Sequence, residues 1–257
     1  MKYIQYKVSQ RIAFITLNRP EKRNALNYDV VTELITAFTS ANSDNNVKVV
    51  ILKAAGKVFC AGADLAYIQQ LQKNTYEENL EDSSNLKDLF YLIYTMDKVV
   101  IAQINGHAIA GGCGLAAVTD FSFAIPEAKF GYTEVKIGFI PAIVSVFLLR
   151  KIGGGKTKEL LLTGTLFDAN KAASYGLINW VVEKNELAQK VLDFSNQLIC
   201  ENSAQSMAMT KKMIHEFQPL SLENALELAV QKNAKARETE DCKKGILAFL
   251  NKEKIKW

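Results

Sequence analysis

The sequence VVIAQINGHAIAGGCG, residues 99–114, decides how this chain folds. Residues 99–104 are mostly apolar and β-branched, a composition typical of a strand that is buried on both faces. Gly111 and Gly112 then allow a tight turn into a helix, because a backbone without a Cβ atom can approach its neighbours closely. In open α/β sheets, ligands bind beyond the carboxyl ends of the strands. The segment therefore predicts an α/β fold with a ligand site at this turn.

A second turn of the same kind lies earlier in the chain. The sequence Phe59-Cys60-Ala61-Gly62-Ala63-Asp64-Leu65 follows a predicted buried strand at residues 47–53. Two such turns side by side could direct two backbone N–H groups at one oxygen atom, which is the geometry of an oxyanion hole. A helix after each turn would add partial positive charge. The spacing alone also permits two tight turns that have no role in binding.

Strands and helices alternate around these two turns. The hydrophobic periodicity predicts further strands at residues 11–17 and 121–124, and helices at residues 27–41, 66–96 and 115–118. The polar middle of the second helical segment, residues 73–84, is expected to be mobile. Beyond residue 142 nearly all predicted elements are helices, at residues 142–151, 156–162, 168–174, 184–200, 203–217 and 221–250. This order predicts an α/β core, residues 1–195, followed by a helical C-terminal region, residues 196–257.

The glycine run at residues 153–155 is similar to the end of a phosphate-binding loop, since Lys156 and Thr157 follow it. That loop requires a glycine where Arg150 stands and a strand before it, whereas a predicted helix precedes this run. The glycines therefore predict a turn between two helices.

Composition sets the broad class of this protein. The chain has 257 residues, 49% hydrophobic and 23% charged, which suits one large α/β domain. The net charge of +4 fits a small anionic ligand, and without a basic stripe or a reading motif a nucleic-acid binder is disfavoured. No segment has the pattern of a membrane span or a signal peptide, so we expect a cytoplasmic protein.

The histidines and cysteines argue against several kinds of site. The two histidines, His107 and His215, are too few for a histidine-rich metal site and disfavour a histidine-centred triad. The four cysteines have neither metal-ligand nor disulfide spacing and are expected to be reduced thiols: Cys60, Cys113, Cys200 and Cys242. We therefore expect no metal centre.

Glu134 is the candidate proton carrier. It lies in the sequence Phe130-Gly131-Tyr132-Thr133-Glu134-Val135, between a glycine turn and an apolar loop at residues 137–143. A partly desolvated carboxylate has a raised pKa, which suits proton transfer near neutral pH. Local sequence alone favours an ordinary surface glutamate at this position.

Four motifs together resemble the enoyl-CoA hydratase/isomerase (crotonase) family. They are Asn18-Arg19-Pro20-Glu21-Lys22-Arg23-Asn24-Ala25-Leu26, Phe59–Leu65, Asn105-Gly106 with Ala110-Gly111-Gly112-Cys113, and Phe130-Gly131 with Glu134. Their order and spacing cover nearly the whole chain. The resemblance implies a spiral of ββα units with a helical C-terminal trimerisation region, and assembly as a homotrimer or a dimer of trimers.

The resemblance also implies an acyl-CoA site without a metal or redox cofactor, coenzyme A being part of the substrate. The backbone N–H groups of Ala63 and Gly111 would hold the thioester oxygen, and Glu134 would move the proton. Residues expected to line the CoA and acyl groups are Arg23, Ala25, Ala61, Asp64, Leu65, Gly114, Tyr132 and Pro141. Phe249 and Lys252 would reach the CoA bound by a neighbouring subunit, although Lys252 is equally compatible with a solvated tail charge.

One departure from the family pattern affects the expected reaction. Many hydratases of this family use two glutamates to hold the attacking water, and the first position is Gly114 here. The surrounding sequence is most similar to bacterial methylglutaconyl-CoA hydratases, so we expect a hydratase acting on a branched or carboxylated acyl group, in fatty acid or leucine degradation. The space freed at Gly114 would admit that group. The alternatives are a Δ3,Δ2-enoyl-CoA isomerase with Glu134 as its single proton shuttle, and a non-catalytic RNA-binding or scaffolding role.

Overall fold

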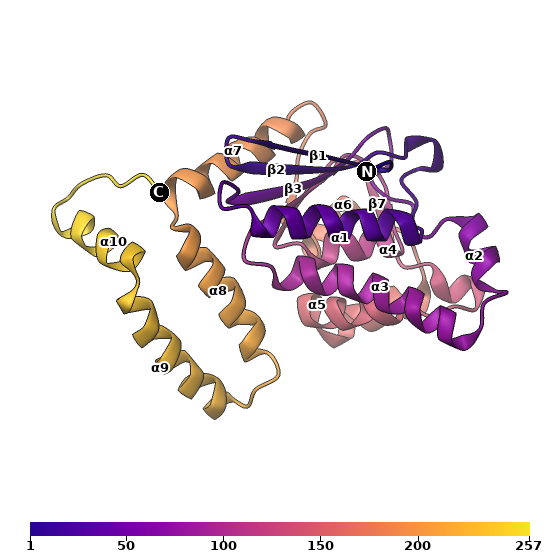
Figure 1. The fold of residues 1–257 in the computed structure, drawn as a ribbon. Helices are drawn as coiled ribbons and strands as arrows, with labels where there is room; N and C mark the ends of the chain where they lie inside the picture. The colour runs from indigo at the N-terminus through magenta and orange to yellow at the C-terminus, as the bar shows by residue number, and fades with distance from the viewer.

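Two sheets form the body of the molecule (Figure 1). The computed structural model describes residues 1–257, with the exception of the side chain of Leu65. The larger sheet has the order β1-β2-β3-β4-β6-β9, in which only β1 and β2 are antiparallel neighbours. Its strands are β1 (Ile4–Ser9), β2 (Ile12–Leu17), β3 (Val49–Ala54), β4 (Val99–Ile104), β6 (Phe121–Ala124) and β9 (Trp180–Val181). The smaller sheet has the order β5-β7-β8, formed by β5 (Ala108–Ile109), β7 (Lys129–Gly131) and β8 (Phe167–Asp168).

Successive units place one strand in each sheet and then form a helix. β4 and β5 lead into α4 (Gly111–Val118), and β6 and β7 lead into α5 (Ala142–Thr163) through the short helix η2 (Glu134–Ile137). The predicted α/β class and its ββα units are confirmed. The strands predicted at residues 99–104 and 121–124 have the predicted bounds. β1 was not predicted, because only one of its residues is buried and its pattern is weak.

Helices cover the larger sheet (Figure 1). The helix α1 (Tyr28–Ser43) begins at Asn27, whose side chain accepts a hydrogen bond from Val30 N–H. The helical segment predicted at residues 66–96 is two helices, α2 (Leu65–Leu71) and α3 (Tyr76–Thr95). A reciprocal cap between Thr75 and Glu78 starts α3, so most of the polar stretch at residues 73–84 is helical. Two shorter connections are η1 (Pro20–Lys22) and α6 (Ala169–Ser174).

The C-terminal region is confirmed as helical. It consists of α7 (Leu187–Glu201), α8 (Ala204–Phe217), α9 (Leu222–Glu238) and α10 (Glu240–Leu250). In Figure 1 the last three helices extend away from the body, and we call residues 204–250 the arm. The single helix predicted at residues 221–250 is wrong, because Thr239 adopts an extended conformation and caps a new helix through Cys242 N–H. The domain boundary after residue 195 stays a prediction, and α7 runs across it.

The glycine run forms a turn inside α5, as predicted. Gly153 has φ of 76° and ψ of 168°, which kinks the element into two helical parts. Among the described residues, no helix combines the length and the apolar character needed to cross a membrane.

Candidate active site

The two glycine turns touch each other. Gly62 has a positive φ of 87°, and a Cβ atom placed there would lie 2.8 Å from Ala110 Cβ and 3.0 Å from Ile109 O. A parallel bridge between Cys60 and Ala108 joins the strand ends just before the turns. The turns predicted to lie side by side therefore do so, and glycine at position 62 is required for their close approach.

The first turn leaves the N–H group of Ala63 free. Gly62 O accepts a hydrogen bond from Leu26 N–H at 2.7 Å, and Asp64 N–H donates to Leu26 O at 2.8 Å. Because alternate residues of an extended chain direct their N–H groups to opposite sides, Ala63 N–H faces away from Leu26. Among the described residues it donates to no protein acceptor, and Ala63 is exposed.

Polar side chains hold the first turn. Arg19 pairs with Asp64 at 2.8 Å, with side-chain exposures of 13% and 10%. Asp64 also caps α2 by accepting a hydrogen bond from Ala66 N–H at 3.0 Å. Burial by itself would raise the pKa of Asp64, but the bond from Ala66 and the pairing with Arg19 outweigh it and lower this pKa. Asp64 is predicted to line the CoA, and its carboxylate binds Arg19 and the Ala66 N–H group within the protein.

Backbone packing holds the second turn. Ala110 has φ of 49° and ψ of −121°, a conformation that strains a residue with a side chain. Its N–H donates to Gly131 O at 2.7 Å and its carbonyl accepts from Gly114 N–H at 2.9 Å. A Cβ atom at Gly112 would lie only 2.3 Å from Cys60 O. Position 112 therefore admits no side chain.

The helix α4 presents the second free donor. Gly111 is its first residue, and the first N–H groups of a helix have no acceptor within the helix. No other described residue accepts from Gly111 N–H. At the opposite end of α4, the Lys151 ammonium donates to Thr119 O at 3.0 Å and Ala116 O at 3.4 Å. Lys151 thus places a positive charge at the carboxyl end of the helix, where it stabilises the helix dipole.

The smaller sheet fixes the position of the Glu134 segment relative to the second turn. β5 and β7 pair in parallel, and Gly131 at the end of β7 accepts the bond from Ala110. Glu134 follows three residues later, at the start of η2. Burial raises the pKa of Glu134 above its ordinary value, although a hydrogen bond from its own backbone N–H opposes the rise. Its Oε2 atom is buried and has no hydrogen-bond partner among the described residues.

The space expected beside Gly114 is filled. A Cβ atom at this position would lie 2.5 Å from Val144 Cγ1 and 2.9 Å from a ring carbon of Phe90. Gly114 is itself buried. The prediction that Gly114 opens room for a branched acyl group is therefore wrong, because side chains of α3 and α5 occupy that room.

The structure brings the predicted CoA-lining residues of the first two motifs together. Arg23 O accepts a hydrogen bond from Ala61 N–H at 3.1 Å, so the segment around Arg23 and Ala25 lies along the first turn. Arg23 is exposed and Ala25 is buried. Pro141 is the residue before α5. Of Leu65, only the backbone, which begins α2, lies within the described part of the chain.

Two predicted residues lie elsewhere. Phe249 lies in α10 at the end of the arm, and Lys252 follows two residues after this helix. Figure 1 shows α10 on the side of the molecule opposite α2. Phe249 is 81% exposed. The pair of turns and Glu134 of one chain therefore do not include Phe249 and Lys252 of that same chain.

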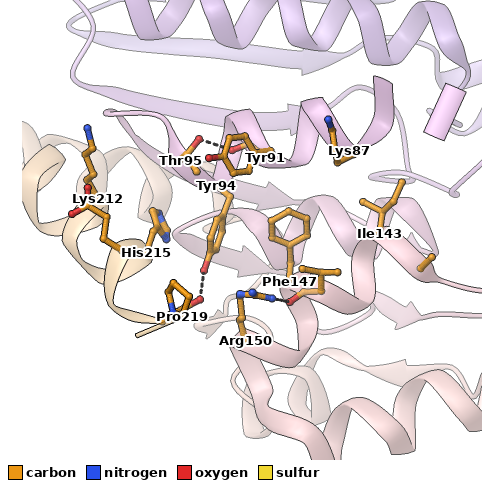
Figure 2. Close-up of a pocket in the computed structure, with 14 residues that line it drawn as sticks. Lys87, Tyr91, Tyr94, Thr95, Ile143, Phe147, Arg150, Lys212, His215 and Pro219 are labelled. Atoms are coloured by element: carbon orange, nitrogen blue, oxygen red, sulfur yellow. Dashed lines mark hydrogen bonds between the residues drawn. The ribbon is translucent and has the colours of Figure 1, made fainter. Parts of the chain in front are cut away.

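A separate cavity of about 730 Å³ lies between α3, α5 and α8 (Figure 2). Its walls include Tyr94, Phe147 and His215, with the rings of Tyr94 and His215 only 4.0 Å apart between centroids. Apart from Leu65, whose side chain lies outside the described part of the chain, none of the predicted site residues lines this cavity. The candidate active site is therefore the pair of turns with Glu134, rather than this cavity.

Sequence reasoning missed three residues of the site. Arg19 belongs to a motif that was recognised, but no role followed from the sequence because its partner Asp64 is 45 positions away. Phe90 and Val144 are ordinary apolar residues of predicted helices, and no sequence signal indicates that both pack on Gly114.

Comparisons with known proteins find similarity along nearly the whole chain. The sequence model described as "Enoyl-CoA hydratase/isomerase" matches residues 7–257. The crotonyl-CoA hydratase of Syntrophomonas wolfei is 34% identical over 247 residues, covering 95% of this chain and 94% of that protein. The short-chain-enoyl-CoA hydratase of Clostridium acetobutylicum is 33% identical over 247 residues, covering 95% and 93%. The crystal structure of an enoyl-CoA hydratase from Shewanella pealeana superposes with a TM-score of 0.94 at 29% identity, covering 99% and 96%.

Proposed function

Because this chain belongs to the enoyl-CoA hydratase/isomerase family and is an enzyme of that family, we propose that it adds water to the double bond of a 2-enoyl-CoA thioester. The observation that carries the proposal is the pair of touching turns with two free N–H groups, together with a half-buried carboxylate three residues after Gly131, which holds the second turn. The N–H groups of Ala63 and Gly111 bind the thioester oxygen. Glu134 moves the proton.

Charge and proton movements follow from this arrangement. As water oxygen bonds to C3 of the substrate, the electrons of the double bond move toward the thioester oxygen, where negative charge accumulates. Two fixed N–H donors stabilise that charge, and loss of one such donor typically costs about 2.7–4 kcal/mol of barrier. Glu134 accepts a proton from the water and returns a proton to C2, so the carboxylate is regenerated. Its raised pKa brings proton transfer closer to balance near neutral pH.

The test of this role is Glu134→Gln. The substitution keeps size and hydrogen bonding but removes the titrating group, so turnover of crotonyl-CoA should fall at least about a hundredfold while binding of the ester is kept. Glu127→Gln is the matched control, since Glu127 is exposed and lies in the same part of the chain. Turnover of Glu134→Gln near that of the control would refute the role of Glu134.

The acyl group is the finer part of the proposal. We favour a short or a branched 2-enoyl group. The 3-methylglutaconyl group expected from the sequence is a branched 2-enoyl group that also carries a carboxylate. With Val144 and Phe90 filling the side of Gly114, any carboxylate on the substrate must bind elsewhere along the site. Incubation of crotonyl-CoA and 3-methylglutaconyl-CoA in oxygen-18 water, with mass spectrometry of the 3-hydroxyacyl products, separates the two.

Isomerisation is the alternative, favoured by the single glutamate. In that reaction Glu134 carries one proton between C2 and C4 of a 3-enoyl-CoA and no water is added. Rapid conversion of a 3-enoyl-CoA to its 2-enoyl form, with no oxygen-18 label in any product, would replace the hydratase proposal with this one.

We also propose that the chain assembles as a homotrimer or a dimer of trimers. Support comes from the arm, whose apolar side chains include Leu222, Val230 and Phe249 with exposures of 79%, 71% and 81%. Soluble monomers rarely expose so many large apolar side chains together. Assembly would bring Phe249 and Lys252 to the CoA of a neighbouring subunit. A monomer by light scattering at micromolar concentration would contradict the assembly.

The cellular location is part of the proposal as well. All four cysteines are free thiols, which fits the cytoplasmic location predicted from the sequence.

A further inference from the structure

The ammonium group at the carboxyl end of α4 has no acidic partner. Lys151 donates to Thr119 O and Ala116 O, and its ammonium lies inside the protein although part of the side chain is exposed. Among the described residues it forms no ion pair. Asp120 directly follows Thr119 but pairs with Lys211 at 2.7 Å. Lys151 therefore leaves a positive charge at this end of α4 that no carboxylate pairs with.

The opposite end of α4 presents the Gly111 N–H group to the site. The helix has eight residues, so its two ends are roughly 12 Å apart at 1.5 Å per residue. Every residue from Gly112 to Val118 is buried, and a charge at one end therefore acts on the other with weak screening by water. Tyr132 belongs to these buried surroundings: it is fully buried next to the Cys113 thiol, rather than lining the CoA as predicted.

The helix α5 lies along α4 and carries Lys151 at the far end of this contact. Near the start of α5, Val144 lies against Gly114, where an added Cβ atom would be 2.5 Å from Val144 Cγ1. Lys151 follows seven residues later, just before the kink at Gly153. One contact fixes the middle of α4 and the other its carboxyl end. The ammonium is thus placed to limit movement of α4, and with it the direction of Gly111 N–H.

We propose that Lys151 is a positioning residue for the oxyanion hole: its ammonium holds the carboxyl end of α4 and adds positive potential at Gly111 N–H. The inference rests on the function proposed above. The thioester oxygen carries more negative charge in the transition state than in the bound ester, so this potential should raise kcat more than it lowers KM. Lys151 does not touch the substrate and transfers no proton.

The titration of Lys151 provides a readout that a purely structural role would not affect. Burial lowers the pKa of Lys151 to about 8, and the charges of Asp120 and Cys113 oppose the change. These two groups face Lys151, with Lys211 beyond Asp120. Above this pKa the positive charge is lost, so kcat should fall to a lower plateau as pH rises through about 8. Because the pKa lies below its ordinary value of 10.5, loss of the proton favours the folded state, and the fall in kcat is not unfolding.

The test compares wild type with Lys151→Met, which removes the charge, and with Lys151→Arg, which keeps it. Two reactions are followed from neutral to alkaline pH: hydration of the ester on which the wild type is most active, and exchange of the α-hydrogens of butyryl-CoA in D2O. Both place negative charge on the thioester oxygen, but only the first adds water. Lys158→Met is the matched control, because Lys158 is an exposed lysine of the same helix.

We expect Lys151→Met to lower kcat of both reactions about fivefold at neutral pH, with KM within about twofold of wild type. This variant should show no further fall around pH 8, and the wild type should approach its rate at alkaline pH. Lys151→Arg should stay within about twofold of wild type at neutral pH and keep its rate at alkaline pH, since a guanidinium stays charged there. Lys158→Met should match wild type throughout.

Other outcomes overturn the inference. Wild-type kcat in Lys151→Met would show that the charge does not act on the site, and equal losses in the methionine and arginine variants would show that only packing matters. An alkaline fall that persists in Lys151→Arg would assign it to another group. If Lys151→Met does not fold, the alkaline profiles of wild type and Lys151→Arg decide. A wild type that hydrates no ester, yet exchanges α-hydrogens with the expected dependence on Lys151, would remove the hydratase proposal and leave the role of Lys151 intact.

Discussion

The two turns that present Ala63 and Gly111 are proposed to bind one oxygen atom, but they are held by different forces. The first depends on charged side chains, since the Arg19–Asp64 ion pair and the cap on Ala66 fix its exit into α2. The second has no side-chain cap. It depends on close backbone packing, with Gly112 against Cys60 and Ala110 in a strained conformation.

This difference predicts different vulnerabilities. A turn held by charge should respond to loss of a charge, and a turn held by packing should respond to a single added methyl group. Each prediction below tests one side of the contrast.

The largest effect is expected from Gly112→Ala. Its Cβ would lie 2.3 Å from Cys60 O and 2.7 Å from Cys60 Cβ, and neither the backbone nor a buried Cβ can move away cheaply. Overpacking of this kind costs about 3 kcal/mol or more, and displacement of Gly111 N–H should remove at least about 99% of turnover. Chemical denaturation and crotonyl-CoA turnover measure the two effects.

Gly111→Ala provides the matched comparison for stability. A Cβ there meets only the end of the Leu26 side chain, at 3.1 Å, which can rotate. We therefore expect this variant to unfold at nearly the wild-type denaturant concentration. If both alanine variants unfold alike, packing on Cys60 does not distinguish the second turn.

Acid should inactivate the enzyme through Glu134 before it disrupts the first turn. The carboxylate form of Glu134 is needed, and burial raises its pKa above 4.5. Log kcat/KM should therefore fall by about one unit per pH unit as pH drops below that raised value. The pKa of Asp64 is lowered from 3.8, so its contribution to stability is kept above the ordinary aspartate range and lost only as pH falls through the lowered value.

The acid loss should consequently be reversible. Far-UV circular dichroism should stay constant across the pH range in which activity falls, and return to neutral pH should restore turnover. Loss of structure together with activity would mean that the ion pair of the first turn breaks first, against the order of the two pKa shifts.

Arg19→Met should have a moderate effect on the first turn alone. Removing one member of a largely buried ion pair leaves Asp64 uncompensated, which typically costs about 3 kcal/mol of stability. We expect turnover to fall about tenfold, because Ala63 N–H directly precedes Asp64 in the turn. Arg150→Met is the control, since the exposed Arg150 guanidinium donates to Val146 O of its own helix and to no other described residue.

Arg19→Lys sharpens this test. Lysine keeps the charge but not the planar geometry of the guanidinium, so partial rescue of stability would identify the charge as the main contribution. Wild-type stability in Arg19→Met would contradict the view that the first turn is held by charge.

The same contrast explains how far the sequence could predict the molecule. The strand at residues 99–104 and the touching turns follow from local patterns, because buried strands and glycine turns have recognisable residues. The pairing of Arg19 with Asp64 and the filling of the space at Gly114 depend on side chains from distant segments. Nothing in their own neighbourhoods identifies these contacts.

The sequence at residues 221–250 predicted one helix where there are two, although a local capping pattern marks the start of the second. Thr239 is followed by the acidic residues Glu240 and Asp241, which is the pattern of a helix N-terminus. Apolar residues continue at helical spacing on both sides of it, so the pattern reads as one helix. Capping residues therefore deserve more weight than uninterrupted periodicity in the middle of a long predicted helix.

The smallest effect is expected from Ala110→Gly, which tests the strain in the second turn. Ala110 has φ of 49° and ψ of −121°, and glycine adopts this conformation without the steric cost of a Cβ atom. Relief of strain should outweigh the entropy cost of glycine and stabilise the protein by about 1 kcal/mol. The methyl group that faces Gly62 is lost, so turnover should fall less than about twofold.

The control is Ala128→Gly, at a buried site without positive φ. Thermal unfolding and kcat/KM of the two variants separate the effect of strain from the general cost of glycine. Destabilisation of Ala110→Gly equal to that of the control would mean that the second turn is held without strain, and that its packing on Cys60 and Gly62 is sufficient to fix the direction of Gly111 N–H.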